Sequence, residues 1–315
     1  MTLRAGVIGV GYLGRFHAQK YALLEETELV GVVDVDRQRA EEIAAECRTR
    51  AFGDYRELLG EVDLVSIAVP THHHFAVARD CLDAGRHVLI EKPITETVAE
   101  AEELIEIARK QRLVFQVGHL ERFNPAILAL EGVLKQPMFI ESHRLAPFKP
   151  RGTDVNVVLD LMIHDIDIIL SAVRSDIIDI HAVGVPVLSE EVDIANARLQ
   201  FATGCVANIT ASRVSREAMR KIRLFQADAY ISIDYQSRNI TVLRKKEGET
   251  AIPGLPNIGL ESHSFGQSDA LLEEIKAFVN AIRNGKAPVV TAEDGKKALE
   301  VAIRINECLL PVLKK

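Results

Sequence analysis

RAGVIGVGYLG, Arg4 to Gly14, joins an apolar run typical of a buried β-strand to the pattern G-x-G-x-x-G. Because helical periodicity follows, the glycines are expected at a strand-to-helix turn, where this pattern indicates dinucleotide binding. We expect Gly9 to permit the tight turn, Gly11 to admit a pyrophosphate to the helix N-terminus, and Gly14 to let the helix pack on the strand. The other loop positions expected to line the cofactor are Val10, Tyr12 and Leu13.

The same alternation of strand and helix patterns continues to about residue 120. The apolar runs include ELVGVVDV, VDLVSIAVP, RHVLIE and LVFQVG, and the helical patterns between them include DRQRAEEIAAECR and ETVAEAEELIEIARK. This order predicts βαβ units in a parallel, doubly wound sheet with helices on both faces. Residues 1–120 are therefore predicted to form a Rossmann dinucleotide-binding domain of the α/β class.

After about Gly118 the pattern changes to runs that alternate apolar and polar residues, such as MFIESHRL, DIANARLQFA and CVANITASRV. Such alternation predicts an antiparallel sheet with one exposed face. We predict a C-terminal α+β domain, residues 121–315, built on an open, mostly antiparallel sheet. Within it, the Pro- and Gly-rich segment 252–266, IPGLPNIGLESHSFG, predicts a loop, and two helical patterns then close the chain.

Composition limits the classes of partner. A net charge of -7 argues against nucleic-acid binding, which needs a basic surface. Four widely spaced cysteines suggest neither a disulfide framework nor a zinc site. The apolar N-terminus is too short to span a membrane and contains glycines rather than a cleavage site. These features predict a cytoplasmic protein that binds a small molecule and neither nucleic acid nor membrane.

Asp34 ends the second apolar run, 20 residues after Gly14. A carboxylate at this place accepts hydrogen bonds from the adenosine ribose, so NAD is favoured over NADP. Arg37 weakens that preference, because a guanidinium there can bind a 2′-phosphate or stack on adenine. Asp36 is expected to cap the following helix.

AVPTHHHF, Ala68 to Phe75, follows the strand that begins after Val62. Adjacent histidines diverge on one element, so a metal site is disfavoured and none is predicted. The loop is instead expected along the cofactor at the carboxyl edge of the sheet, through Pro70, Thr71 and His74, with Thr71 as a helix cap.

LIEKPITET, Leu89 to Thr97, places Glu91, Lys92 and Pro93 just beyond another apolar strand, at the same sheet edge as the glycines. A lysine there is either directed at the reactive end of the cofactor or is a solvated surface lysine before a helix. All three residues are predicted to contact the cofactor.

VVLDLMIHDIDIIL, Val157 to Leu170, is an apolar segment that carries ionisable groups. At about 100° per residue, Asp160, His164, Asp167 and Ser171 share one face of a helix, and Asp165 points elsewhere. Buried carboxylates are unfavourable unless they are paired. The stripe is therefore a self-satisfied network, a metal site of Asp160, His164 and Asp167, or a face that binds a ligand.

The motifs GVGYLG, AVPTHHH, EKP, GHLERFNP and DLMIHDID, in this order and spacing, resemble those of the glucose-fructose oxidoreductase / inositol dehydrogenase (Gfo/Idh/MocA) family over essentially the whole chain. The resemblance implies an NAD(P)-binding Rossmann domain and a second domain that holds a sugar or polyol and forms oligomer contacts. It assigns functional roles to Lys92 and to the pair Asp160 and His164, with Asp167 matching a following acid. Met162 departs from the family, which often has glycine there.

The resemblance predicts hydride transfer between a CH–OH group and nicotinamide. Either His164, steadied by Asp160, or Lys92 takes the hydroxyl proton. Basic segments around Arg144 and Arg213 hint at a phosphorylated substrate. The predicted substrate-binding residues are Lys92, Arg122, Lys149, Asp160, His164 and Arg213.

The form of DLMIHDIDIIL resembles the branch that acts on nucleotide-diphosphate sugars, such as UDP-N-acetylglucosamine 3-dehydrogenases. The alternatives are a dehydrogenase of a free sugar or an inositol-like polyol, a reductase of the biliverdin reductase type, and an NAD-binding sensor or scaffold without turnover. An open sheet needs covering, so a homodimer or homotetramer formed through the C-terminal sheet is expected.

Overall fold

The computed structural model describes residues 2–148, 155–246 and 257–313 and divides the chain into two units. The first comprises Met1–Phe123 and Asp269–Leu299, and the second comprises Asn124–Ser268 and Glu300–Lys315. The predicted boundary at residue 120 lies close to Phe123. The C-terminal segment differs from expectation, because Asp269–Leu299 groups with the first unit.

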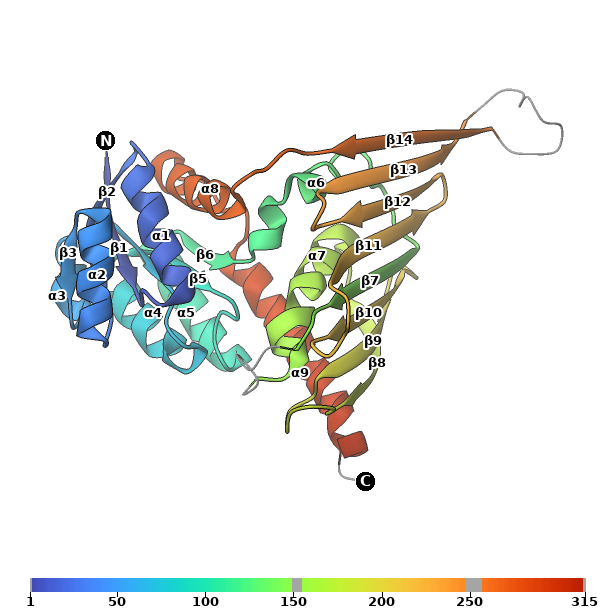
Figure 1. The fold of residues 1–315 in the computed structure, drawn as a ribbon, viewed down its shortest axis with the longest axis horizontal. Helices are drawn as coiled ribbons and strands as arrows, with labels where there is room; N and C mark the ends of the chain where they lie inside the picture. The colour runs from blue at the N-terminus through green and yellow to red at the C-terminus, as the bar shows by residue number, and fades with distance from the viewer. Residues whose placement is uncertain (1, 149–154, 247–256, 314–315) are drawn as a thin grey trace. The chain divides into compact units, whose positions relative to one another are not determined.

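The first unit contains a sheet of six strands in the order β3-β2-β1-β4-β5-β6, all paired in parallel (Figure 1). The order reverses at β1 and β4, as in doubly wound folds, so the predicted Rossmann sheet is confirmed. The strands are β1 (Leu3–Ile8), β2 (Thr27–Val33), β3 (Arg50–Phe52), β4 (Leu64–Ile67), β5 (His87–Glu91) and β6 (Phe115–Gly118).

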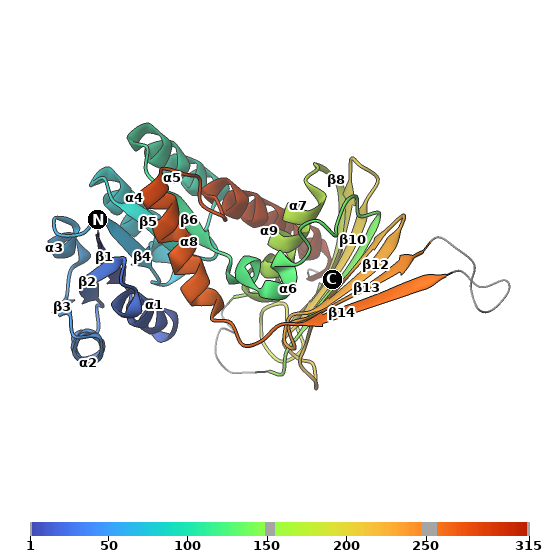
Figure 2. The ribbon, with the colours of Figure 1, turned by 90° about the horizontal axis from the view of Figure 1, so that it is seen from above.

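Helices cover both faces of this sheet, with α1, α2 and α8 on one and α4 and α5 on the other (Figure 2). Ile275 and Phe278 of α8 pack in one buried cluster with Val7 and Tyr21, which explains why α8 belongs to the first unit. The helical segments are α1 (Tyr12–Leu23), α2 (Arg37–Cys47), α3 (Tyr55–Leu59), η1 (Thr71–His73), α4 (His74–Asp83), α5 (Val98–Gln111), η2 (Leu120–Phe123), α8 (Ala270–Asn284) and α9 (Ala292–Leu313), the last of which continues into the second unit.

The second unit is built on a sheet of eight strands in the order β14-β13-β12-β11-β7-β10-β9-β8 (Figure 1). Every neighbouring pair is antiparallel except β7 with β10, so the predicted mostly antiparallel sheet is confirmed. The strands are β7 (Phe139–Leu145), β8 (Ile177–Val185), β9 (Ile194–Phe201), β10 (Val206–Ser212), β11 (Met219–Gln226), β12 (Ala229–Asp234), β13 (Asn239–Lys245) and β14 (Ile258–Ser264).

One face of this sheet is buried, and α7 (Ile163–Val173) packs against β7 and β10. Ile140, Ile222 and Leu224 share that face and are fully buried. A short helix, α6 (Pro125–Leu128), contacts β12, and a π-helix, η3 (Val158–Met162), leads into α7. The buried face of the sheet thus supports the helix that carries the ionisable stripe.

The loop prediction for residues 252–266 is wrong over Ile258–Ser264, which forms β14 at the edge of the sheet beside β13. Nearly all of its side chains are exposed, so the segment lacks the apolar alternation by which a half-buried strand is recognised. Backbone pairing with β13 forms the strand without a buried face. Among the described helices, none has the length and apolar character required to cross a bilayer.

Candidate functional site

The glycine loop is built as its spacing predicts. Gly9 adopts a φ of +83°, a conformation that side chains disfavour. A Cβ atom on Gly14 would lie 1.8 Å from the Gly9 carbonyl oxygen, so only glycine fits where α1 passes the end of β1. A Cβ atom on Gly11 would meet no atom within 4 Å. Gly11 therefore leaves open space beside the loop.

The N-terminus of α1 suits a phosphate group. No side chain caps this helix, and its first turn contains no acidic residue, so the positive end of its dipole favours an anion. Tyr12 and Leu13 are 64% and 41% exposed. The uncapped helix end and the space beside Gly11 fit a dinucleotide pyrophosphate.

Asp34 follows β2 and holds the glycine loop in place. One carboxylate oxygen accepts a hydrogen bond from the Val10 N–H over 3.0 Å, and the other accepts one from the Asp36 N–H over 2.9 Å. Arg39 approaches the same carboxylate at 3.5 Å, whereas Arg37 is exposed and pairs with Glu41. The sequence did not single out Arg39 as the guanidinium nearest to Asp34.

The residue after Asp36 begins α2, and Asp36 caps this helix through the Arg39 N–H, as predicted. Thr71, by contrast, is not the cap of α4, because it begins the short helix η1. Pro70 precedes η1 at the carboxyl end of β4. His74, the first residue of α4, is buried, and its ring nitrogens lie 2.8 Å from the Pro93 carbonyl oxygen and 3.0 Å from that of Val69. This ring therefore joins the loop after β4 to the EKP segment.

Glu91 ends β5, and its carboxylate faces the inside of the first unit. Oε1 lies 3.0 Å from Nε2 of His17 on α1, and Oε2 accepts a hydrogen bond from the Lys92 N–H over 3.3 Å. Burial would raise the pKa of Glu91, but the hydrogen bond and charge of His17 and the charge of Lys92 outweigh it and hold that pKa below its ordinary value. A Cβ atom on Gly118 would lie 3.2 Å from Oε2, so glycine leaves room for the carboxylate.

The His17 ring continues inward as a polar network. Its Nδ1 lies 3.1 Å from Ser66 Oγ, which lies 2.9 Å from the Tyr21 hydroxyl. Burial raises the pKa of Tyr21. Glu274 of α8 is also fully buried, and burial, followed by the Glu91 charge, raises its pKa well above the ordinary value.

Sequence reasoning missed this network, although it left a signal. Gly14, His17, Ala18 and Tyr21 recur at helical spacing and form the buried face of α1. Glu274 lies on the buried face of α8, one turn before Phe278. A histidine and a glutamate on such faces mark positions that need buried partners.

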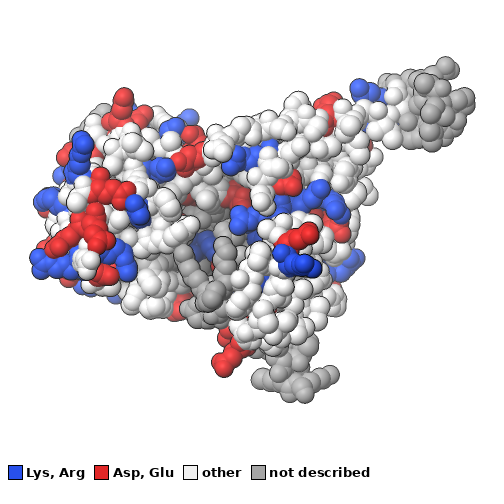
Figure 3. Space-filling view, viewed as in Figure 1, with Lys and Arg blue, Asp and Glu red and all other residues white. Residues whose placement is uncertain are grey.

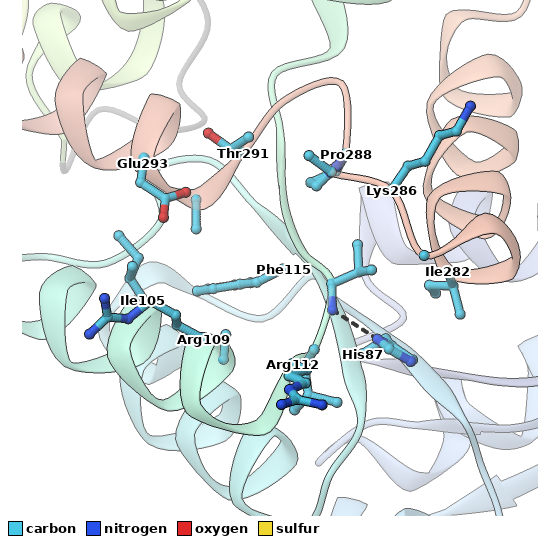
Figure 4. Close-up of a pocket in the computed structure, with 16 residues that line it drawn as sticks. His87, Ile105, Arg109, Arg112, Phe115, Ile282, Lys286, Pro288, Thr291 and Glu293 are labelled. Atoms are coloured by element: carbon cyan, nitrogen blue, oxygen red, sulfur yellow. Dashed lines mark hydrogen bonds between the residues drawn. The ribbon is translucent and has the colours of Figure 1, made fainter.

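A cavity of about 360 Å³ in the first unit lies at the opposite edge of the sheet from the glycine loop, beside His87 and Phe115 at the starts of β5 and β6 (Figure 4). His87 Nδ1 accepts a hydrogen bond there from the Val114 N–H. Open α/β sheets bind ligands at the carboxyl ends of their strands. This cavity is therefore distinct from the candidate cofactor site.

In the second unit, the expectation of one regular helix over 157–170 is wrong for Val158–Met162, which forms a π-helix. A π turn takes an extra residue, so the spacing of about 100° per residue does not hold between Asp160 and His164. Both side chains are half-buried, and Asp167 is 1% exposed. π turns occur often at functional sites, which suits this position.

Asp165 points away from the stripe, as its position in α7 predicts, and is paired with the sheet. Its carboxylate accepts hydrogen bonds from Ser142 Oγ at 2.8 Å and from Arg144 Nε at 2.6 Å. Arg144 is 3% exposed, and its guanidinium lies 5.5 Å from the centre of the Tyr235 ring. Asp165 and Arg144 thus form a buried pair between α7 and β7.

Arg213 is also buried. Its Nε donates to Asp193 over 2.8 Å and its Nη1 donates to the Val155 carbonyl over 2.6 Å. These contacts favour a structural role, and substrate binding by Arg213 stays a prediction. Arg122 lies in η2 and is half-buried, whereas Lys149 lies outside the described residues.

Further basic side chains gather over β11 on the face of the second unit seen in Figure 3. Arg220, Lys221 and Arg223 belong to this strand. Arg223 pairs with Glu141 of β7 over 2.8 Å. Among the residues that the structure describes, no group of three metal-ligating side chains converges.

Comparison with known proteins agrees with this geometry. Residues 3–119 match the oxidoreductase family with an NAD-binding Rossmann fold, and residues 128–232 match the GFO/IDH/MocA C-terminal domain. The chain is 42% identical to UDP-N-acetylglucosamine 3-dehydrogenase of Acidithiobacillus ferrooxidans over 314 residues, and this alignment covers 99% of both chains. It is 28% identical to myo-inositol 2-dehydrogenase of Thermotoga maritima, over 94% of this chain and 93% of that one.

Solved structures show the same likeness. The structure of the Acidithiobacillus ferrooxidans enzyme superposes with a TM-score of 0.94 over 100% of both chains. Scyllo-inositol dehydrogenase of Lactobacillus casei, solved with NAD(H) and scyllo-inositol, gives 0.82 at 22% identity over 99% of this chain and 98% of that one, a likeness of fold. The chain belongs to the Gfo/Idh/MocA family of oxidoreductases, with an NAD-binding Rossmann fold in its first part.

Proposed function

We propose that the protein is an NAD-dependent dehydrogenase that oxidises the C3 hydroxyl of UDP-N-acetylglucosamine. The observation that carries this proposal is the 42% identity, spread over 99% of both chains, to an enzyme named for that reaction. The polyol dehydrogenases that also resemble the chain are less similar, at 28% identity for the Thermotoga maritima enzyme. Oxidation of an inositol is therefore the second candidate.

When bound, NAD accepts a hydride from the carbon that carries the hydroxyl. We assign removal of the hydroxyl proton to His164, because an imidazole titrates near neutral pH. Asp160 orients the imidazole and stabilises its charged form, and Lys92 donates a hydrogen bond to the oxygen as negative charge develops on it. In the alternative assignment Lys92 takes the proton itself. Arg122 and Lys149 are the cations that we assign to the diphosphate.

For the cofactor we infer NAD rather than NADP. The buried Asp34 carboxylate at the end of β2 suits ribose hydroxyls and repels a 2′-phosphate. The exposed Arg37, which weakened this preference in the sequence, pairs with Glu41.

We further infer a cytoplasmic homo-oligomer that forms through the sheet of the second unit. Support comes from β8, whose apolar side chains Ile178, Val183 and Val185 are 60%, 51% and 49% exposed. Val183→Glu is expected to reduce the mass of the wild-type assembly measured by mass photometry. An unchanged mass would place the interface elsewhere.

The test of the proposed function mixes the protein with NAD and, in parallel, UDP-N-acetylglucosamine, N-acetylglucosamine, myo-inositol and scyllo-inositol. Reduced nicotinamide is followed by its absorbance. We expect reduction with UDP-N-acetylglucosamine at the highest kcat/KM. Reduction only with an inositol would establish the second candidate, and no reduction with any of the four would overturn both.

The residue assignments have their own test. Lys92→Ala and His164→Ala are each expected to lower kcat by about 10²- to 10⁴-fold while NAD affinity stays near wild type. Full turnover in either variant would refute the role of that residue.

A further inference from the structure

We propose that His17 is a positioning residue for Lys92: backed by Ser66 and Tyr21, it fixes the ionised Glu91 carboxylate, and that carboxylate holds Lys92 as an ammonium. The proposal rests on the proposed function in giving Lys92 a part in the reaction. All of the residues in the chain of contacts belong to the first unit.

The contacts form one continuous line. Tyr21 OH lies 2.9 Å from Ser66 Oγ, and Ser66 Oγ lies 3.1 Å from His17 Nδ1. His17 Nε2 lies 3.0 Å from Glu91 Oε1, and Glu91 Oε2 accepts from the Lys92 N–H. The side chains of Tyr21, Ser66 and His17 are 0 to 1% exposed, so the two bonds that join them are shielded from water.

One arrangement of protons satisfies the line with a neutral imidazole. Tyr21 O–H donates to Ser66, Ser66 O–H donates to His17 Nδ1, and His17 Nε2–H donates to Glu91. In the reverse order the Tyr21 O–H would have no acceptor among the described residues. Because burial keeps Tyr21 protonated, its single proton gives the line a direction, toward the carboxylate.

The surroundings of Glu91 make this bond decisive. The titratable groups that interact with Glu91 are His17 of α1, His74 of α4, Glu274 of α8 and the adjacent Lys92. Tyr21 of α1 interacts with Glu274. A carboxylate that is 14% exposed beside a second buried carboxyl would take up a proton without a donor such as His17. With the donor, Glu91 stays ionised and Glu274 stays protonated, so the negative charge is located next to Lys92.

A substrate-independent test measures the charge state of Lys92 in the full-length protein. The chain is labelled with acetic anhydride over a range of pH, and mass spectrometry follows modification of Lys92, which proceeds only through the free amine. We expect His17→Leu and Glu91→Gln to lower the midpoint of labelling by about one pH unit. His17→Gln, whose amide can still donate to Glu91, is expected to stay close to wild type.

The same variants are compared by pH profiles of kcat, with thermal melting and NADH binding as checks on folding. The activity of His17→Leu is expected to decline at lower pH than that of the wild type on the alkaline side, and His17→Gln is expected to restore the profile. Unchanged labelling midpoints in His17→Leu and Glu91→Gln would overturn the proposal. A wild type that oxidises no substrate would instead refute the proposed function and leave the labelling result valid.

Discussion

Glu274 offers the most quantitative prediction, because it is a carboxyl with 0% exposure whose side-chain oxygens have no hydrogen-bond partner among the described residues. Burial and the nearby Glu91 raise its pKa well above the ordinary 4.5. At a pH between the ordinary pKa of the unfolded chain and the raised pKa of the folded chain, Glu274 keeps a proton in the folded chain that it releases on unfolding. The free energy of unfolding therefore falls as pH rises, by about 1.4 kcal/mol per pH unit.

The variant Glu274→Gln removes this titration and keeps a neutral side chain of similar size. Relative to the wild type, its free energy of unfolding is expected to rise by roughly 3 kcal/mol between pH 5 and pH 7, which is two units of the slope above. Contributions from other titrating groups cancel in the difference. The chain has no tryptophan, so urea unfolding is followed by circular dichroism.

Glu273→Gln is the matched control on the same helix, because Glu273 is 50% exposed and pairs with Lys276 at the surface. The difference in free energy of unfolding between Glu273→Gln and the wild type is expected to change far less with pH. If the free energies of unfolding of Glu274→Gln and the wild type differ by the same amount at pH 5 and pH 7, the inference that Glu274 is protonated in the folded chain is refuted.

Three further predictions concern the cofactor loop and the second unit. Gly14→Ala is expected to destabilise the protein by about 3 kcal/mol, because the alanine Cβ would meet the Gly9 carbonyl. Gly11→Ala is expected to keep the wild-type melting temperature and to weaken NADH binding, measured by fluorescence titration. Asp34→Ala is expected to raise the KM for NAD about tenfold or more and to reduce the preference over NADP; an unchanged ratio of kcat/KM values would contradict the role given to this carboxylate. Arg213→Met should lower stability by about 3–5 kcal/mol by stranding a buried partner, and a loss of substrate affinity at full stability would instead support substrate binding.

The parts of the fold that could be predicted are those encoded locally. The turn at Gly9–Gly14 and the alternation of strands and helices each depend on neighbouring residues, and the structure confirms both. The grouping of α8 with the first unit was not predictable in this way, because it depends on contacts between Phe278 and residues such as Val7 near the start of the chain.

The site residues follow the same division. Motifs led to the prediction of Lys92 and His164, and that prediction stays untested by the fold. No motif indicated the partner of Asp165, because Arg144 lies on a different element and its pairing requires the fold. Helical periodicity also fails wherever the helix is not regular, as at the π-helix that contains Asp160. The sequence pattern placed the ionisable groups on one helical segment, but it could not establish in which directions their side chains point around the helix axis.

The return of α8 to the first unit has a consequence for synthesis of the chain on the ribosome. The apolar cluster around Val7 and Tyr21 includes Ile275 and Phe278, so it stays incomplete while the whole of the second unit's sheet is being made. During that interval the nascent Rossmann segment exposes the apolar patch that α8 will cover, which makes it a client for chaperones that bind apolar surface. A chain that ends after Phe123 would carry that exposed patch permanently.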